Sequence, residues 1–70
     1  MNLPVIDARG LACPEPVVLT QQAHRQHKQF AVLVDNKVAV QNIARFCQNR
    51  GLALTVTEEN GEYRLEIAAK

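Results

Sequence analysis

The stretch FAVLV at residues 30–34 decides the fold. An unbroken apolar run of this length, with aromatic and β-branched members, is typical of a central strand that other parts of the chain cover. The segments before it predict a short strand over residues 3–8 and a helix from Pro14 to about His27. A strand, a helix and a strand in this order predict a parallel strand pair with a right-handed crossover.

A second helix is predicted directly after this strand. Asp35 or Asn36 is suited to cap its first turn, and Gly51 is suited to end it. The residues that share one face of this helix are Ala39, Ile43, Phe46 and Cys47. We therefore expect Cys47 to pack as an apolar residue in the core.

The sequence does not decide which face of the first helix is buried. One stripe at helical spacing contains Pro16, Leu19, Thr20, Ala23 and His27. The neighbouring stripe contains Val17, Gln21 and His24. The pattern is weak, so either stripe could face the sheet.

Two strands are predicted over residues 52–58 and 62–67, because apolar and polar residues alternate in both. Asn60–Gly61 between them is typical of a two-residue hairpin turn. This alternation indicates that helices cover only one face of the sheet. The sequence therefore predicts an α+β fold: a two-layer α/β sandwich with the order βαβαββ, in which two helices lie on one face of a mixed four-stranded sheet. We expect residues 1–70 to form a single domain.

Composition narrows the classes of function. Hydrophobic residues make up 47% of the chain, charged residues 21%, and the net charge is +1, which argues against disorder and against strong recruitment of nucleic acid or an anionic membrane. The apolar run at residues 3–6 is too short for a signal segment, so we expect a cytoplasmic protein. Two cysteines far apart, without a CxxC or Cys/His cluster, predict no metal and no cofactor.

The residues that could take part in a chemical reaction lie around Cys13. Pro14 suits the first position of a helix, so Cys13 falls at or beside the N-cap, where the positive end of the helix dipole stabilises a thiolate. Arg9 could add positive charge if the turn at Arg9–Gly10 brings it close. A carboxylate facing the thiol would raise its pKa, so we expect Glu15 to point toward solvent.

The two prolines restrict the backbone on both sides of Glu15. Pro14 favours extended geometry at Cys13, whereas Pro16 disfavours helical geometry at Glu15. The helix therefore begins near Pro16, or Glu15 is mildly strained. We expect the prolines to give rigidity, and we expect Asp7 to accept hydrogen bonds from N–H groups of the following turn.

Residues 7–16, DARGLACPEP, resemble the CPxP signature of the TusA/SirA/YedF sulfur-carrier family. Residues 32–36, 42–46 and 61–63 resemble the corresponding segments of its YedF-like branch, so the resemblance covers nearly all of the chain. It implies a βαβαββ sandwich similar to the C-terminal domain of a bacterial translation initiation factor. Some YedF-like proteins carry a further DsrE-like domain, which these 70 residues do not include.

The resemblance implies a small sulfur carrier of the cytoplasm rather than a turnover enzyme. Cys13 would accept sulfane sulfur as a persulfide from a donor such as a cysteine desulfurase and pass it to an acceptor protein with a reactive thiol. The implied destinations are sulfur or selenium metabolism, or tRNA thiolation. The supporting residues that the motif implies are Asp7, Arg9, Gly10, Pro14, Glu15 and Pro16.

Two other classes of function stay open. A thiol redox sensor would need a second reachable thiol, for which Cys47 looks badly placed. The hypothesis of a regulatory or RNA-binding module rests only on analogy with similar folds. The near-neutral charge and 4% aromatic content argue against direct nucleic-acid binding.

Other polar residues have simpler explanations beside functional ones. His24 and His27 fit a solvated helix face better than a metal site. Arg45 and Arg50 fit a solvated edge of the second helix, or a basic rim suited to an acidic docking surface.

Overall fold

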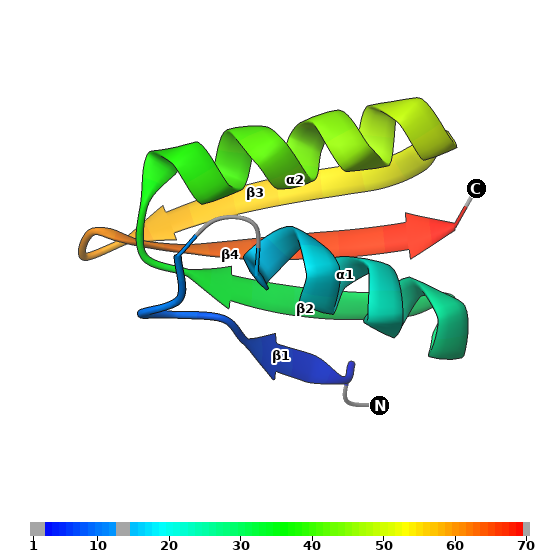
Figure 1. Ribbon diagram of the computed structural model, residues 1–70, viewed down its shortest axis with the longest axis horizontal. Helices are drawn as coiled ribbons and strands as arrows, with labels where there is room; N and C mark the ends of the chain where they lie inside the picture. The colour runs from blue at the N-terminus through cyan, green and yellow to red at the C-terminus, as the bar shows by residue number, and fades with distance from the viewer. Residues whose placement is uncertain (1–2, 13–14, 70) are drawn as a thin grey trace.

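The computed structural model describes residues 3–12 and 15–69 and has two layers, a four-stranded sheet and a pair of helices on one of its faces (Figure 1). The elements are β1 (Val5–Asp7), α1 (Glu15–Gln26), β2 (Gln29–Val34), α2 (Lys37–Arg50), β3 (Leu52–Glu59) and β4 (Glu62–Ala69). The strand order is β1-β2-β4-β3, with β1 and β2 parallel and the other two pairs antiparallel. The predicted fold class is confirmed.

The topology brings distant segments to one edge of the sheet. Strands β1 and β2 run in parallel from the register Val5↔Ala31 to Asp7↔Leu33, so their carboxyl ends lie side by side. The helices return antiparallel to the strands, so both helices begin at this edge, and the turn between β3 and β4 also lies there (Figure 1). We call this side, with residues 8–12, 35–36 and 60–61, the turn edge.

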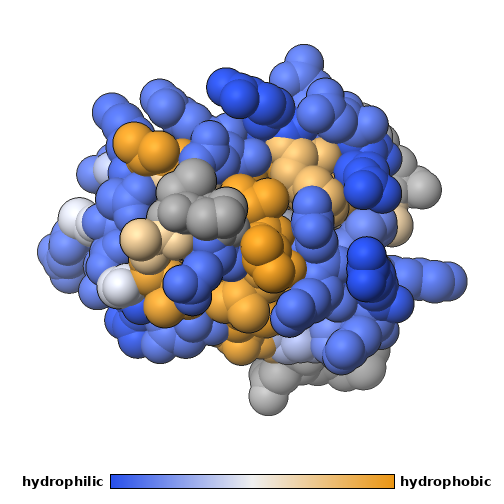
Figure 2. Space-filling view, in the orientation of Figure 1, coloured by the Kyte–Doolittle hydropathy of each residue, from blue (hydrophilic) through white to orange (hydrophobic). Residues whose placement is uncertain are grey.

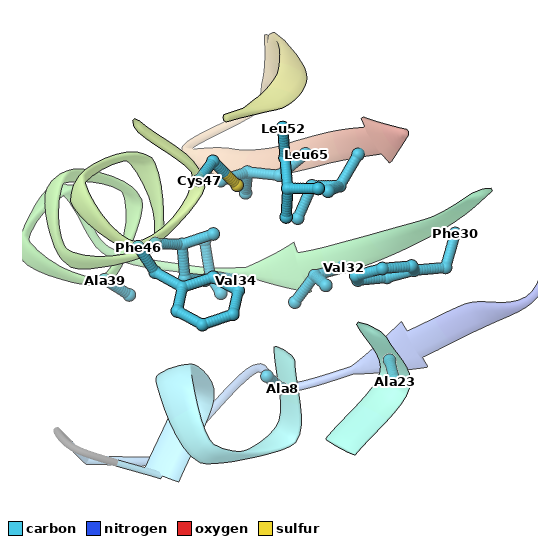
Figure 3. Packing of buried hydrophobic residues seen from close by; sticks show 12 residues of the cluster. Ala8, Ala23, Phe30, Val32, Val34, Ala39, Phe46, Cys47, Leu52 and Leu65 are labelled. Atoms are coloured by element: carbon cyan, nitrogen blue, oxygen red, sulfur yellow. The ribbon is translucent and has the colours of Figure 1, made fainter. Parts of the chain in front are cut away.

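The core lies between the helices and the inward side of the sheet (Figure 3). Phe30, Val32 and Val34 alternate along β2 and are fully buried, as the apolar run predicts. Residues of β4 and α2 complete this layer, among them Leu65 and Ile43, both 0% exposed. Ala31 is also buried, although it points to the opposite face of β2.

Helix α1 packs with the first of its two candidate stripes. Pro16, Thr20 and Ala23 are its buried residues, whereas Val17 is only half-buried. The Thr20 hydroxyl donates a hydrogen bond to the Pro16 carbonyl at 2.8 Å, so this polar group is satisfied in the core. The small Ala23 lets the helix approach the sheet closely.

Local signals fix the ends of the elements. Asn36, not Asp35, caps α2, because its side-chain oxygen accepts a hydrogen bond from the Ala39 N–H at 2.8 Å. Gly51 ends α2 in the left-handed region with φ 68°. Asn60 and Gly61 both have positive φ, 54° and 79°, as a type I′ hairpin turn requires.

Strand β1 is shorter than the predicted range of residues 3–8. Pro4 lacks an N–H and contributes only its carbonyl, which accepts a hydrogen bond from the Ala31 N–H at 2.8 Å. Ala8 still donates its N–H to the Leu33 carbonyl at 2.8 Å before the chain turns away. The regular ladder is therefore confined to Val5–Asp7.

Candidate functional site

Helix α1 begins at the turn edge with Glu15 and Pro16, the last two residues of the CPxP segment. Cys13 and Pro14 lie outside the described residues, so the site is defined by the residues on both sides of them. After them, Glu15 opens α1, and its backbone N–H donates to the Ala12 carbonyl at 2.9 Å. The Glu15 side chain is exposed, as expected for a residue that points toward solvent.

Pro16 fixes the start of α1 against the sheet. It is the second residue of the helix and is less than 2% exposed. The first four N–H groups of a helix have no intrahelical acceptor, so the N–H that proline lacks is not missed at this position. Pro16 is therefore compatible with both the helix and the packing. Its buried ring anchors the chain at the start of α1.

Three side chains from different segments clamp the turn that precedes Cys13. The Arg9 guanidinium donates from Nε to Asp7 Oδ1 at 2.9 Å and from Nη2 to Asp7 Oδ2 at 2.8 Å. Its Nη1 donates to Glu62 Oε1 at 3.2 Å across the sheet. The Arg9 backbone N–H donates to Asp7 Oδ1 at 3.1 Å, the hydrogen bond that the sequence predicts for Asp7. We call these three residues the Arg9 clamp.

The clamp changes the electrostatic role that the sequence suggested for Arg9. Its charge is taken up by the two carboxylates of Asp7 and Glu62, so it adds no net positive field to the turn edge. The side-chain and backbone hydrogen bonds from Arg9, with its charge, lower the pKa of Asp7 to about 2. The same two carboxylates raise the pKa of Arg9. The guanidinium is thus paired with two carboxylates, and because Cys13 lies outside the described residues, direct activation of its thiol by Arg9 stays a prediction.

The pKa of Asp7 tests the clamp in solution. Replacing Arg9 by glutamine should raise the Asp7 pKa from about 2 toward its ordinary value of 3.8. Because the folded-state pKa is lowered, the stabilisation by the clamp is complete above pH 3.8 and is lost as the pH falls through 2. Carboxyl ¹³C chemical shifts followed through an acid titration give the pKa, with Glu66, which pairs with Arg64, as an internal control. An unchanged Asp7 pKa in the variant would contradict the clamp.

A second attachment holds the next residue of the turn. The Gly10 backbone N–H donates to Asp35 Oδ2 at 2.9 Å. Gly10 has φ 77°, in the left-handed region that glycine adopts most easily. Residues 9 and 10 are thus tied both to the end of β1 and to the loop after β2.

Sequence reasoning missed Asp35 and Glu62 as supports of the site. Asp35 could have been found from the sequence. It follows a strand predicted to run parallel to the strand that ends at Asp7, and the carboxyl ends of parallel strands share one edge of the sheet. Glu62 carried no such signal. Its approach to Arg9 depends on β4 lying next to β2, which the order of the strands in the chain does not reveal.

Cys47 is confirmed as a packed core residue. It is 1% exposed, and its side chain points from α2 toward Leu52 and Leu65 (Figure 3). Burial raises the pKa of its thiol to about 11, which suppresses the reactive thiolate near neutral pH. Cys47 is therefore a poor partner for a disulfide or a thiol-exchange step.

His24 of α1 has structural surroundings. The His24 ring meets the Phe46 ring edge to face, with centroids 6.1 Å apart. Within residues 3–12 and 15–69, His, Cys, Asp and Glu side chains form no group of three or more that could hold a metal ion. A search of the same residues finds no helix long and apolar enough to span a membrane.

The surface near the start of the helices contains exposed apolar side chains. Val18 on α1 and Val38 on α2 are 41% and 58% exposed, and Leu11 before the motif is half-buried. Figure 2 shows hydrophobic residues gathered in the middle of the helix face, with hydrophilic residues around them. Single exposed valines of this kind are ordinary on a protein surface.

Comparison with known proteins identifies a family. The family model described as sulfurtransferase TusA matches residues 5–69. A relative from Methanocaldococcus jannaschii, named as a candidate sulfur carrier protein, is 35% identical over 68 residues, covering 93% of this chain and 89% of that protein. The crystal structure of a SirA-like protein from Desulfitobacterium hafniense matches with a TM-score of 0.88 and 29% identity, over 96% of this chain and 97% of the other.

The matches agree with the resemblance seen in the CPxP segment and with the fold. They extend over all six elements of the structure, from β1 to β4. They do not separate the branches of the family, so the assignment to the YedF-like branch stays a prediction. The chain belongs to the TusA family of sulfur carriers.

Proposed function

We propose that Cys13 carries sulfane sulfur as a persulfide, taking it from a donor protein such as a cysteine desulfurase and passing it to an acceptor thiol. The observation that carries this proposal is the attachment of the chain on both sides of the cysteine. Arg9 and Gly10 are held by Asp7, Glu62 and Asp35 before it, and Pro16 is buried after it. So many contacts to so short a segment favour a functional role for the thiol over a thiol without a function.

The proposed chemistry is thiol exchange with one additional sulfur. The Cys13 thiolate attacks the outer sulfur of the donor persulfide, so that a new S–S bond forms as the donor's S–S bond breaks. The donor leaves as a thiolate, and Cys13 becomes a persulfide. In the second step the acceptor thiolate attacks the outer sulfur, and Cys13 leaves as a thiolate. Sulfur moves as a neutral atom in both steps, so no external oxidant or reductant is needed.

The start of α1 is the available source of activation. An α-helix of 12 residues places partial positive charge at its first turn, which favours a thiolate or a persulfide anion there. Because Arg9 is paired with two carboxylates, the proposal assigns the activation to the helix rather than to that side chain. Asp7, Arg9, Gly10 and Pro16 act in this proposal as supports of backbone geometry. A reducing compartment such as the cytoplasm keeps such a thiol free.

A loading assay tests the proposal. The purified protein is incubated with a cysteine desulfurase, pyridoxal phosphate and cysteine, and its intact mass is measured before and after treatment with a reductant. We expect a gain of one sulfur atom per chain that the reductant removes. Failure to gain sulfur from the desulfurase or from any persulfide donor would overturn the carrier function. A disulfide between the two cysteines after mild peroxide treatment would favour the redox sensor instead.

A further inference from the structure

The near-neutral net charge hides a separation of charge between the two layers. Helix α2 contains Lys37, Arg45 and Arg50 and no acidic residue. Strands β3 and β4 together contain four glutamates and a single arginine, Arg64. The helix layer is therefore basic and the hairpin acidic, so a partner's charge decides which face it approaches.

The arginines of the two layers also differ in how they are paired. On the sheet side, Arg9 bonds to Asp7 and Glu62, and Arg64 bonds to Glu66. In the part of the chain that the structure describes, no carboxylate forms an ion pair with the three helix arginines, Arg25, Arg45 and Arg50. These three guanidinium groups are thus available to a carboxylate from outside the chain.

Two of these arginines converge on a cleft between α1 and α2. The cleft has a volume of about 80 Å³ and is lined by Gln21, His24, Arg25, Phe46 and Arg50. Its polar groups include two guanidinium groups, an imidazole and an amide, and no carboxylate is among them. Figure 2 shows that the surface over the carboxyl ends of the helices is mainly hydrophilic.

Phe46 packs against two of the polar groups that line the cleft. It is 8% exposed, with the guanidinium carbon of Arg50 at 5.3 Å from its ring centroid and His24 against it. The helix dipole favours a cation in the last turn of a helix, which explains one cation on each helix. It does not explain why both cations line the same cleft around one aromatic ring.

We infer that the cleft between α1 and α2 binds a carboxylate from an acidic segment of a partner protein. Guanidinium groups present paired N–H donors that match the two oxygens of a carboxylate. A water molecule takes about 30 Å³ in the liquid, so a cleft of about 80 Å³ has room for a group of carboxylate size. The binding does not require the Cys13 thiol, so it stands apart from the proposed sulfur relay.

The same features disfavour a nucleic acid as the occupant. Single-stranded nucleic acids bind through bases stacked on free aromatic faces, whereas the Phe46 ring already contacts Arg50 and His24. The acidic hairpin on the other side of the molecule would repel an extended polyanion. A short acidic stretch of protein needs only the helix face.

The test is an NMR titration of the ¹⁵N-labelled protein with a hexaglutamate peptide that has blocked ends. We expect the largest amide shifts at residues 21–25 and 46–50, and their loss in about 0.5 M NaCl, where the screening length is only about 4 Å. Arg25→Gln and Arg50→Gln should each weaken binding by about fivefold or more. Arg45→Gln is the matched control, because it removes the same charge from the same layer outside the cleft and should change affinity by less than about twofold.

Three results would overturn the inference. The first is the absence of hexaglutamate binding at low salt. The second is equal weakening by Arg45→Gln, which would show a general attraction to the layer rather than a site. The third is tighter binding of a uridine hexanucleotide, or of inorganic phosphate, than of hexaglutamate in the cleft. Should Arg50→Gln disturb the spectrum broadly through loss of its contact with Phe46, Arg25→Gln decides the result.

Discussion

Replacing Cys13 by serine should leave the protein unable to gain sulfur in the loading assay. A hydroxyl is a far weaker nucleophile than a thiolate at neutral pH and forms no persulfide, so the expected loss is complete. The fold should be retained, because the attachments that the structure describes for this turn involve Asp7, Arg9, Gly10, Asp35 and Glu62. Intact mass after incubation with a cysteine desulfurase and cysteine gives the answer.

Cys47→Ser is the matched control, since it removes the only other thiol of the chain. The buried Cys47 has a raised pKa, so this variant should still load one sulfur in its folded fraction. Serine in the core costs stability, and a circular dichroism spectrum checks that the control is folded. Loading of Cys13→Ser equal to that of the wild type would place the sulfur on Cys47 and contradict the assignment.

Phe30→Ala should have the largest effect on stability, lowering the free energy of unfolding by about 3–5 kcal/mol. Phe30 is 0% exposed and lies opposite Ile67 in the centre of the sheet, so its removal leaves a cavity that rigid strands cannot close. Folded proteins have a free energy of unfolding of roughly 0.05–0.15 kcal/mol per residue, which gives only about 4–10 kcal/mol for a chain of this length. Urea denaturation followed by circular dichroism measures the change.

Val18→Ala provides the comparison for Phe30→Ala. Val18 is 41% exposed on α1, and alanine is the better helix former, so the free energy of unfolding should change by less than about 0.5 kcal/mol. A loss for Phe30→Ala as small as this would mean that the core does not depend on the Phe30 side chain.

The parts of the fold that local chemistry determines were predictable from the sequence. The FAVLV run specified β2, Gly51 ended α2, and Asn60–Gly61 formed the hairpin turn, because each depends on neighbours along the chain. The buried stripe of α1 was not predictable, since its residues contrast too weakly in polarity. Packing against the sheet selected the stripe with Pro16.

The candidate site was predictable only as far as the motif reaches. Residues 7–16 indicated the cysteine and the turn before it, but the side chains that hold this turn come from β4 and from the loop after β2. The surroundings of Arg9 were hidden for the same reason. The sequence offers Asp7 as a carboxylate two residues away, but the second carboxylate, Glu62, approaches from 53 residues away.

The order β1-β2-β4-β3 has a consequence for biosynthesis. Strand β4 is translated after the other three strands of the sheet, yet it lies between β2 and β3 and is hydrogen-bonded to both. While residues 62–69 are still inside the ribosomal tunnel, β3 has no neighbouring strand to pair with and the sheet is split. The emerging chain therefore cannot complete its core until translation has passed β4, and a message truncated before that point yields a product that quality-control proteases can recognise as unfolded.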